Sequence, residues 1–155
     1  MRKRNWFEKF VASFKNTFLV KQKPLEETLL KAIEINPLLF EKVYDPSKDV
    51  QLKAVSKDGL LIRYIEDPIE EVQLAAIKQN IQALKHIEKP TINVLKSAVE
   101  ISHRAIKNIE NPTEELIKLA INKYPYSVLY LGMDNLSEEI RRLLPDDLKD
   151  VKKNK

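Results

Sequence analysis

The chain has 155 residues, of which 43% are hydrophobic and 32% are charged, a balance typical of a folded soluble protein rather than a disordered one. It contains no cysteine, which excludes disulfides, thiolate catalysis and cysteine-based zinc sites and fits a reducing cytoplasm. No run of residues approaches the ~18 apolar residues of a membrane span, so we expect a cytoplasmic protein with one domain.

Residues 1–23 carry the basic excess behind the net charge of +4. They hold seven basic residues and one acidic residue, whereas residues 24–155 hold 20 basic and 22 acidic ones. Aromatic residues at helical spacing predict one apolar face, formed by Trp6, Phe7, Phe10, Phe14 and Phe18. A basic face is predicted at Arg2, Lys3, Arg4, Lys9 and Lys15.

This N-terminal helix fits three roles. It can cap the first repeat, which would otherwise leave Leu29, Ile33 and Phe40 in contact with water. It can bind nucleic acid through its basic residues. It can also lie on an anionic membrane surface or in an acidic groove of a partner. We favour the cap because the end of a repeat array needs covering, and the basic flank can remain exposed in that arrangement.

Residues 24–133 contain five repeats of 22 residues. Prolines recur at this period, at Pro24, Pro46, Pro68, Pro90 and Pro112. Alanines follow eight residues later, each before Ile or Val, at Ala32, Ala54, Ala76, Ala98 and Ala120. Repeats of this length predict an α-solenoid, whose continuous surface is suited to binding.

Each repeat is predicted to be a helix of about ten residues, a tight turn and a shorter helix. Asp45, Asp67 and Asn111 precede the prolines and are predicted as N-caps. On that register three glutamates would complete capping boxes, at Glu26, Glu70 and Glu114. Breakers near Asn36, Asp58, Asn80, Ser102 and Tyr124 should end the helices. In the second half, burial spaced as in Leu61, Ile62 and Ile65 favours a short helix or 3-10 turn over a strand.

The last part of the chain departs from the period. Asp134 replaces the proline and Arg142 stands in the alanine column. Residues 134–145 are predicted to form a C-terminal capping helix that ends at Pro145, and residues 146–155 a frayed charged tail.

The units "DPSKDVQLKAV", "DPIEEVQLAAIKQN" and "NPTEELIKLAI" resemble the leucine-rich-repeat-variant family and related short HEAT-like repeats. They are also similar to a repeat family of unknown function that is common in phage and bacterial proteins. The resemblance implies a right-handed superhelix of alternating α and shorter helices, and it brings no catalytic residues. It also implies that the chain is a phage-encoded factor that engages a host protein.

Residues for catalysis are sparse. His86 and His103 occupy different repeat columns without companions at metal-ligand spacing, which favours structural histidines. Gly59 and Gly132 are the only glycines, so there is no glycine-rich phosphate loop. We therefore predict a protein that is not an enzyme and needs no metal or cofactor.

Candidate binding residues also fall in columns. Leu30, Leu52 and Leu74 either pack between repeats or form an apolar strip for a protein partner. Tyr64 and Tyr130 share a column and serve either as interface anchors or in the turns between repeats. A basic column could follow a phosphate backbone, but glutamates three residues later should neutralise it. That column is Arg63, Lys85 and Lys107, followed by Glu66, Glu88 and Glu110. The favoured function is the binding of another protein.

Overall fold

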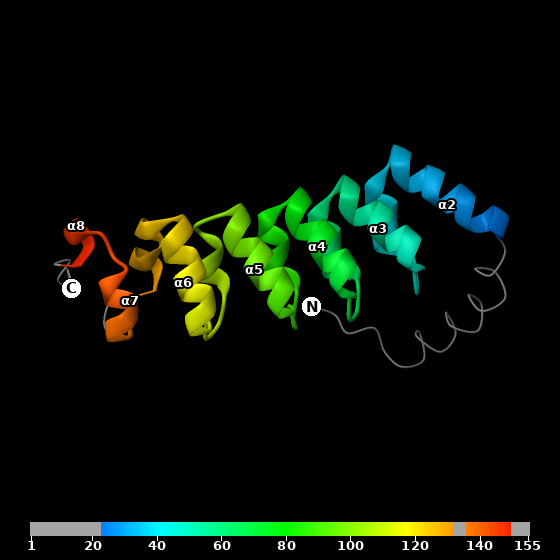
Figure 1. The fold of residues 1–155 in the computed structure, drawn as a ribbon. Helices are drawn as coiled ribbons and strands as arrows, with labels where there is room; N and C mark the ends of the chain where they lie inside the picture. The colour runs from blue at the N-terminus through cyan, green and yellow to red at the C-terminus, as the bar shows by residue number, and fades with distance from the viewer. Residues whose placement is uncertain (1–22, 132–135, 150–155) are drawn as a thin grey trace.

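The computed structural model describes residues 23–131 and 136–149, and all regular elements in these ranges are helices (Figure 1). The α-helices are α2 (Lys23–Ile35), α3 (Lys48–Lys57), α4 (Glu70–Gln79), α5 (Ile92–Ile101), α6 (Glu114–Lys123), α7 (Glu138–Arg142) and α8 (Asp146–Lys149). The 3-10 helices are η1 (Pro37–Lys42), η2 (Gly59–Tyr64), η3 (Ile81–His86), η4 (Ala105–Asn108) and η5 (Pro125–Tyr130). An α-helix and the 3-10 helix that follows it form one unit, so α2 to η5 make five units, as the period predicts.

The five units pack one after another in a row (Figure 1). Each α-helix from α2 to α5 contacts the next α-helix, and each 3-10 helix from η1 to η4 contacts the next 3-10 helix. The row therefore has an α side and a 3-10 side, and α2 and α8 lie at opposite ends.

The alanine column lies at the centre of the packing. Ala54, Ala76, Ala98 and Ala120 are completely buried, and the branched residue after each of them is buried as well. A methyl group at this position allows neighbouring α-helices to approach to the short end of the ~8–10 Å packing range. Ala32, in the first unit, is only half-buried.

The predicted N-caps are wrong by two residues. Ser47, Thr91 and Thr113 are the N-caps of α3, α5 and α6, and each side-chain oxygen accepts a hydrogen bond from the backbone N–H three residues later. The proline stands immediately before the cap. In the third unit Ile69 occupies the cap position and makes no side-chain bond, so α4 lacks the roughly 1 kcal/mol that a polar cap contributes.

The glutamates do not complete capping boxes either, because Glu70 and Glu114 are the first residues of their helices. They accept hydrogen bonds from the following unit instead. Ser137 Oγ donates to Glu114 Oε1 at 3.0 Å, and Ser47 Oγ donates to Glu26. Hydrogen bonds from Thr91 and Asn93 lower the pKa of Glu70. These carboxylates therefore join successive units.

In three units the residue before the proline of the repeat adopts a left-handed backbone conformation. Asp45, Asp67 and Asn111 have φ angles of 47°, 50° and 51°, a region that Asp and Asn tolerate far better than most residues. The aspartates and the asparagine are therefore explained by the turn and not by a cap.

We expect Asp67→Val to lower the free energy of unfolding by about 1–2 kcal/mol, because a β-branched residue is strained at a φ of 50°. Asp67→Gly should be close to neutral, since glycine adopts this conformation freely. Urea denaturation of both variants checks this. Equal losses in the two would mean that the carboxylate, and not the backbone conformation, is what the turn requires.

The second half of each unit is a 3-10 helix, which confirms the preference for a short helix or 3-10 turn over a strand. The predicted breakers do two jobs here. Asp58 and Asn80 end an α-helix, and their side chains accept the backbone N–H of Leu60 and Gln82 to begin the next 3-10 helix. This double cap explains how α3 and α4 pass into their 3-10 helices with a single residue between them, whereas three residues separate α5 from η4.

Two glutamines hold the turns that precede their own helices. Gln51 Nε2 donates to the carbonyl oxygen of Pro46 at 2.9 Å, and Gln73 Nε2 donates to that of Pro68 at 2.8 Å. Gln73 is 5% exposed and also accepts the N–H of Thr91 at 3.3 Å. A buried polar side chain thus satisfies backbone groups in two neighbouring units.

The C-terminal end agrees with the sequence in part. Ser137 caps α7 and Ile140 is buried on it, but α7 ends at Arg142, before the predicted Pro145, and the buried Leu144 follows the helix. The expected charged tail differs from the structure at its start, because residues Asp146–Lys149 form α8 and bury Leu148. Residues 150–155 lie outside the described ranges.

Candidate protein-binding surface

Exposed aromatic and large apolar side chains are found on the 3-10 helices near the two ends of the row. On η5, Tyr126 is 58% exposed and Leu129 is 53% exposed. On η1, Leu38 is 61% exposed. The middle of this side is polar, since η3 presents Lys85 and His86 to solvent. The 3-10 side thus offers separate apolar areas rather than one continuous strip.

The predicted leucine column lies mostly within the packing. Leu30, Leu52 and Leu74 are half-buried and pack against core clusters. Their burial favours the predicted packing between repeats over the predicted exposed apolar strip. Lys96 and Lys118 continue the column as partners in ion pairs with the next helix, to Glu115 and Glu139.

Tyr64 and Tyr130 end η2 and η5 and are each 39% exposed. The guanidinium of Arg63 lies 4.9 Å from the centroid of the Tyr64 ring. The Tyr130 ring stacks on His103, with centroids 6.1 Å apart. Both tyrosines therefore present part of a ring to solvent while the rest contacts the protein, as interface anchors do.

A small hollow lies beside this stack, between the fourth and fifth units. It has a volume of about 310 Å³ and is lined by His103, Lys123, Tyr124, Pro125, Tyr126 and Ser127. The His103 and Tyr124 rings are 5.7 Å apart, and the Tyr124 hydroxyl donates to the carbonyl oxygen of Glu100 at 3.3 Å. Two units thus build one aromatic wall.

Two polar groups of the hollow have contrasting surroundings. The Tyr126 hydroxyl donates to Asp147 Oδ2 at 2.9 Å, and this bond raises the pKa of Tyr126. The Ser127 hydroxyl is fully buried and has no hydrogen-bond partner in the part of the chain that the structure describes. Such a group costs about 1–3 kcal/mol relative to a satisfied one.

Sequence reasoning missed Ser127 and Tyr126, although the repeat alignment holds a signal for Ser127. Its column contains Leu39, Leu61, Ala83 and Ala105 in the other units. A hydroxyl in an otherwise apolar column is the kind of local exception that marks a functional position.

The predicted i, i+3 pairing of the basic column with glutamates on one helix is wrong. Arg63, Lys85 and Lys107 are all exposed, but the glutamates three residues later do not share a helix with them. In each case an extended residue intervenes, namely Ile65, Ile87 and Ile109. The i, i+3 argument fails because each 3-10 helix ends before its glutamate. Within the described ranges Lys85 and Lys107 form no ion pair.

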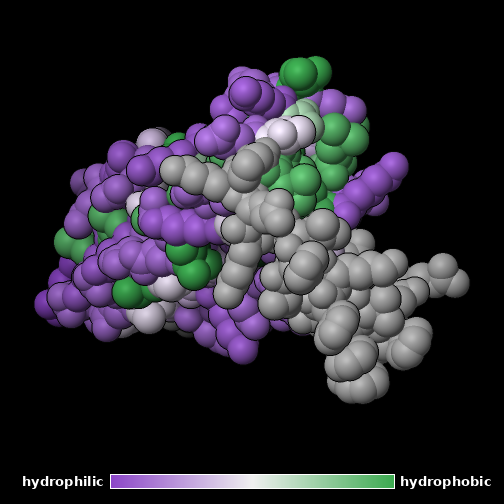
Figure 2. Space-filling model, turned by 90° about the vertical axis from the view of Figure 1, so that its right-hand side faces the viewer, coloured by the Kyte–Doolittle hydropathy of each residue, from purple (hydrophilic) through white to green (hydrophobic). Residues whose placement is uncertain are grey.

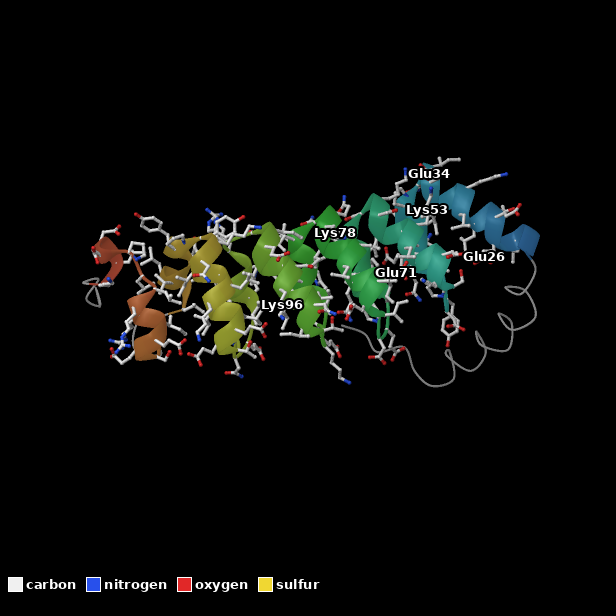
Figure 3. All side chains as sticks on the ribbon, in the orientation of Figure 1. Glu26, Glu34, Lys53, Glu71, Lys78 and Lys96 are labelled. Atoms are coloured by element: carbon white, nitrogen blue, oxygen red, sulfur yellow. The ribbon has the colours of Figure 1, made fainter. Side chains whose placement is uncertain are left out.

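The α side shows the opposite arrangement, since several of its charges form ion pairs from one unit to the next, as Lys53 does with Glu34 (Figure 3). These pairs are Lys53 and Lys57 with Glu34, Lys48 with Glu71, Lys96 with Glu115, and Lys118 with Glu139. Hydrogen bonds from Lys53 and Lys57 lower the pKa of Glu34. Exposed pairs of this kind contribute little to stability, but they leave fewer free charges on this side.

The α2 end of the row carries a further apolar area (Figure 2). Ile35 is 85% exposed there and Leu25 is 47% exposed, whereas Ile33 and Phe40 are buried. The predicted cap over Leu29, Ile33 and Phe40 stays a prediction, because the aromatic residues that would form it lie outside the described residues. The predicted basic face, at Arg2, Lys3, Arg4, Lys9 and Lys15, lies outside the described residues.

The histidines differ in surroundings. His86 is exposed on η3, and His103 is half-buried between two tyrosine rings. The described residues include no group of three or more acidic or histidine side chains placed to hold a metal ion. Within the same residues no helix combines the length and the apolar character that crossing a membrane requires.

Comparison of the chain with protein-family models, curated proteins and solved structures finds no match. The likeness to leucine-rich-repeat variants therefore stays a prediction, and what is established is an all-helical row of repeated α and 3-10 helices.

Proposed function

We propose that this chain is a right-handed α-solenoid without catalytic activity that binds another protein through its 3-10 side. The observation that carries the proposal is the exposure of Tyr64, Tyr126, Leu129 and Tyr130 on this one side. Tyrosine supplies a large rigid contact area with a polar tip, and it is enriched at protein interfaces.

The charges support the choice of side. Across the α side, ion pairs between units satisfy many of the exposed carboxylates and lysines. On the 3-10 side, Lys85 and Lys107 stay without a carboxylate partner among the described residues. Unpaired charges beside exposed aromatic residues favour a partner of complementary charge. The resemblance to phage and bacterial repeats suggests a host protein as this partner.

Nucleic acid and an anionic membrane remain the alternatives, both through residues 1–23. Neither is favoured by the described residues, because the exposed side chains of the 3-10 side mix aromatic, apolar, basic and acidic types. A groove for a phosphate backbone would instead need sustained positive charge.

The test is quantitative affinity capture from the native host with the full-length chain. We expect Tyr64→Ala combined with Leu129→Ala to reduce recovery of the main captured protein about tenfold, as the loss of interface anchors does. Ile92→Ala combined with Ile101→Ala is the matched control, because these α5 side chains are 44% and 43% exposed. Equal recovery with all three baits would exclude the 3-10 side as the binding surface.

A further inference from the structure

The hollow between the fourth and fifth units has the properties of a binding subsite. Its volume of about 310 Å³ falls at the small end of the range for ligand pockets, enough for one large side chain. Rings of His103, Tyr124 and Tyr126 line it, so its walls are mainly aromatic. An aromatic side chain would meet these rings in the edge-to-face or offset arrangements that aromatic pairs prefer.

The lining of the hollow carries one cation, and two more follow His103 closely in the sequence. Lys123 is part of the lining, and its Nζ lies 5.8 Å from the centroid of the Tyr124 ring. Arg104, the N-cap of η4, is exposed next to His103, and Lys107 is exposed on η4. None of these three cations pairs with a carboxylate within residues 23–131 and 136–149.

One carboxylate lies beside the hollow but is not part of its lining. Asp147 accepts the hydrogen bond of Tyr126, and Glu100 contributes its backbone carbonyl oxygen, not its carboxylate, to Tyr124. The lining therefore contains a lysine and no carboxylate.

Ser127 supplies an independent indication. Ser127 is one of the lining residues, its hydroxyl is buried without a hydrogen-bond partner among the described residues, and its column is apolar in the other four units. The hydroxyl is not exposed to solvent, so a ligand reaches it only if neighbouring side chains move, and it would then donate to an oxygen atom of that ligand.

We propose that this hollow binds an acidic peptide segment of the partner protein, with an aromatic side chain inserted between His103, Tyr124 and Tyr126 and flanking carboxylates held by Lys123 and Arg104. The proposal rests on the proposed protein-binding function and names the chemistry of the partner. Complementary charge selects the acidic segment, and the aromatic walls select the anchor.

The test uses the full-length protein and three fluorescein-labelled nine-residue peptides. The first has a central tryptophan flanked by aspartates and glutamates, the second replaces each acidic residue with lysine, and the third replaces the tryptophan with alanine. Fluorescence anisotropy at physiological salt should show binding of the first peptide, no binding of the second and binding about tenfold weaker for the third.

Variants locate the site. Lys123→Glu and Tyr126→Ala should each weaken binding of the acidic tryptophan peptide about tenfold. Tyr126→Phe keeps the ring but loses the bond to Asp147, so it should bind like the native protein and shows that any loss in Tyr126→Ala is not due to displacement of α8. Lys78→Glu makes the same charge change at an exposed position of α4 and should have little effect.

Three results would overturn the proposal: no binding of the acidic tryptophan peptide, equal binding of the lysine peptide, or equal weakening by Lys78→Glu and Lys123→Glu. None of them depends on the capture experiment, whose variants Tyr64→Ala and Leu129→Ala are outside the lining of the hollow. If the capture experiment supports the 3-10 side but the acidic tryptophan peptide does not bind, only the proposal of an acidic peptide segment is refuted.

Discussion

Replacing Gly59 with alanine is expected to lower the free energy of unfolding by about 3 kcal/mol, at the upper end of the range for overpacking. Gly59 is buried at the start of η2. A Cβ atom added there would lie 2.4 Å from the carbonyl oxygen of Ala76 in the next unit. Because the obstacle is backbone, no side-chain rotation can relieve it, and the second and third units must move apart.

The same position is held by a hydrogen bond that the variant would disturb. The Gly59 N–H donates to Gln79 Oε1 at 2.6 Å, and Gln79 Nε2 donates to the carbonyl oxygen of Lys57 at 3.2 Å. Gln79→Ala removes this link without adding volume and serves as the control, with an expected loss of about 1 kcal/mol. Urea denaturation measures both. A Gly59→Ala loss no larger than that of Gln79→Ala would mean that the units separate at little cost.

Ala76→Leu is expected to cost roughly 1–3 kcal/mol. Ala76 is completely buried in the central unit, in the column where neighbouring α-helices approach one another. Three additional carbon atoms there must separate α4 from a neighbour or force side chains off their rotamers. The thermal midpoint should fall by about 2–4 °C for each kcal/mol lost in a chain of this length.

Ala75→Leu is the matched control for Ala76→Leu. The two alanines are adjacent on α4 and the change in volume is identical, but Ala75 is only half-buried. Its column holds Leu119 in the fifth unit, so a leucine is already accommodated at this position elsewhere in the row. We expect Ala75→Leu to cost less than 1 kcal/mol, which is about the cost of a tolerated hydrophobic exchange. Similar midpoints for the two variants would remove the role of the alanine column in close helix packing.

The Gly59→Ala and Ala76→Leu variants test two different contacts between neighbouring units. Gly59 reports on contact between the start of a 3-10 helix and the end of the next α-helix, through the carbonyl of Ala76. Ala76 reports on contact between α-helices. Other units carry a side chain at the position of Gly59, such as Ile81 and Pro125, so the close approach at Gly59 is specific to the second and third units.

Much of the fold followed from the repeat. The 22-residue period, the α-helices of ten residues from α3 to α6, and their ends at Asp58, Asn80 and Ser102 agree with the structure. From the second unit to the fifth, the alanine of the column and the branched residue after it are both buried, as predicted. These features depend on spacing and on local capping, which act within about ten residues of the chain.

The N-cap prediction failed because two residue types compete for one role. Aspartate before proline and serine or threonine after it are both good caps. In this chain the aspartate adopts the left-handed conformation of the turn and the hydroxyl residue is the N-cap of the helix, as at Asp45 and Ser47. Which of them caps depends on the backbone path that enters the helix, and spacing alone does not reveal that path.

The sequence by itself determined that this protein is a row of five helical units with small residues at the centre of their packing. It did so because each unit repeats the same local signals, and helix formation and termination respond to nearby residues. Only the tertiary structure decided which charges are paired, as for Glu34 and Lys53, and which side chains share the hollow, as for His103 and Tyr126. Those contacts join residues about 20 positions apart, and their distances are set by how closely one unit packs on the next.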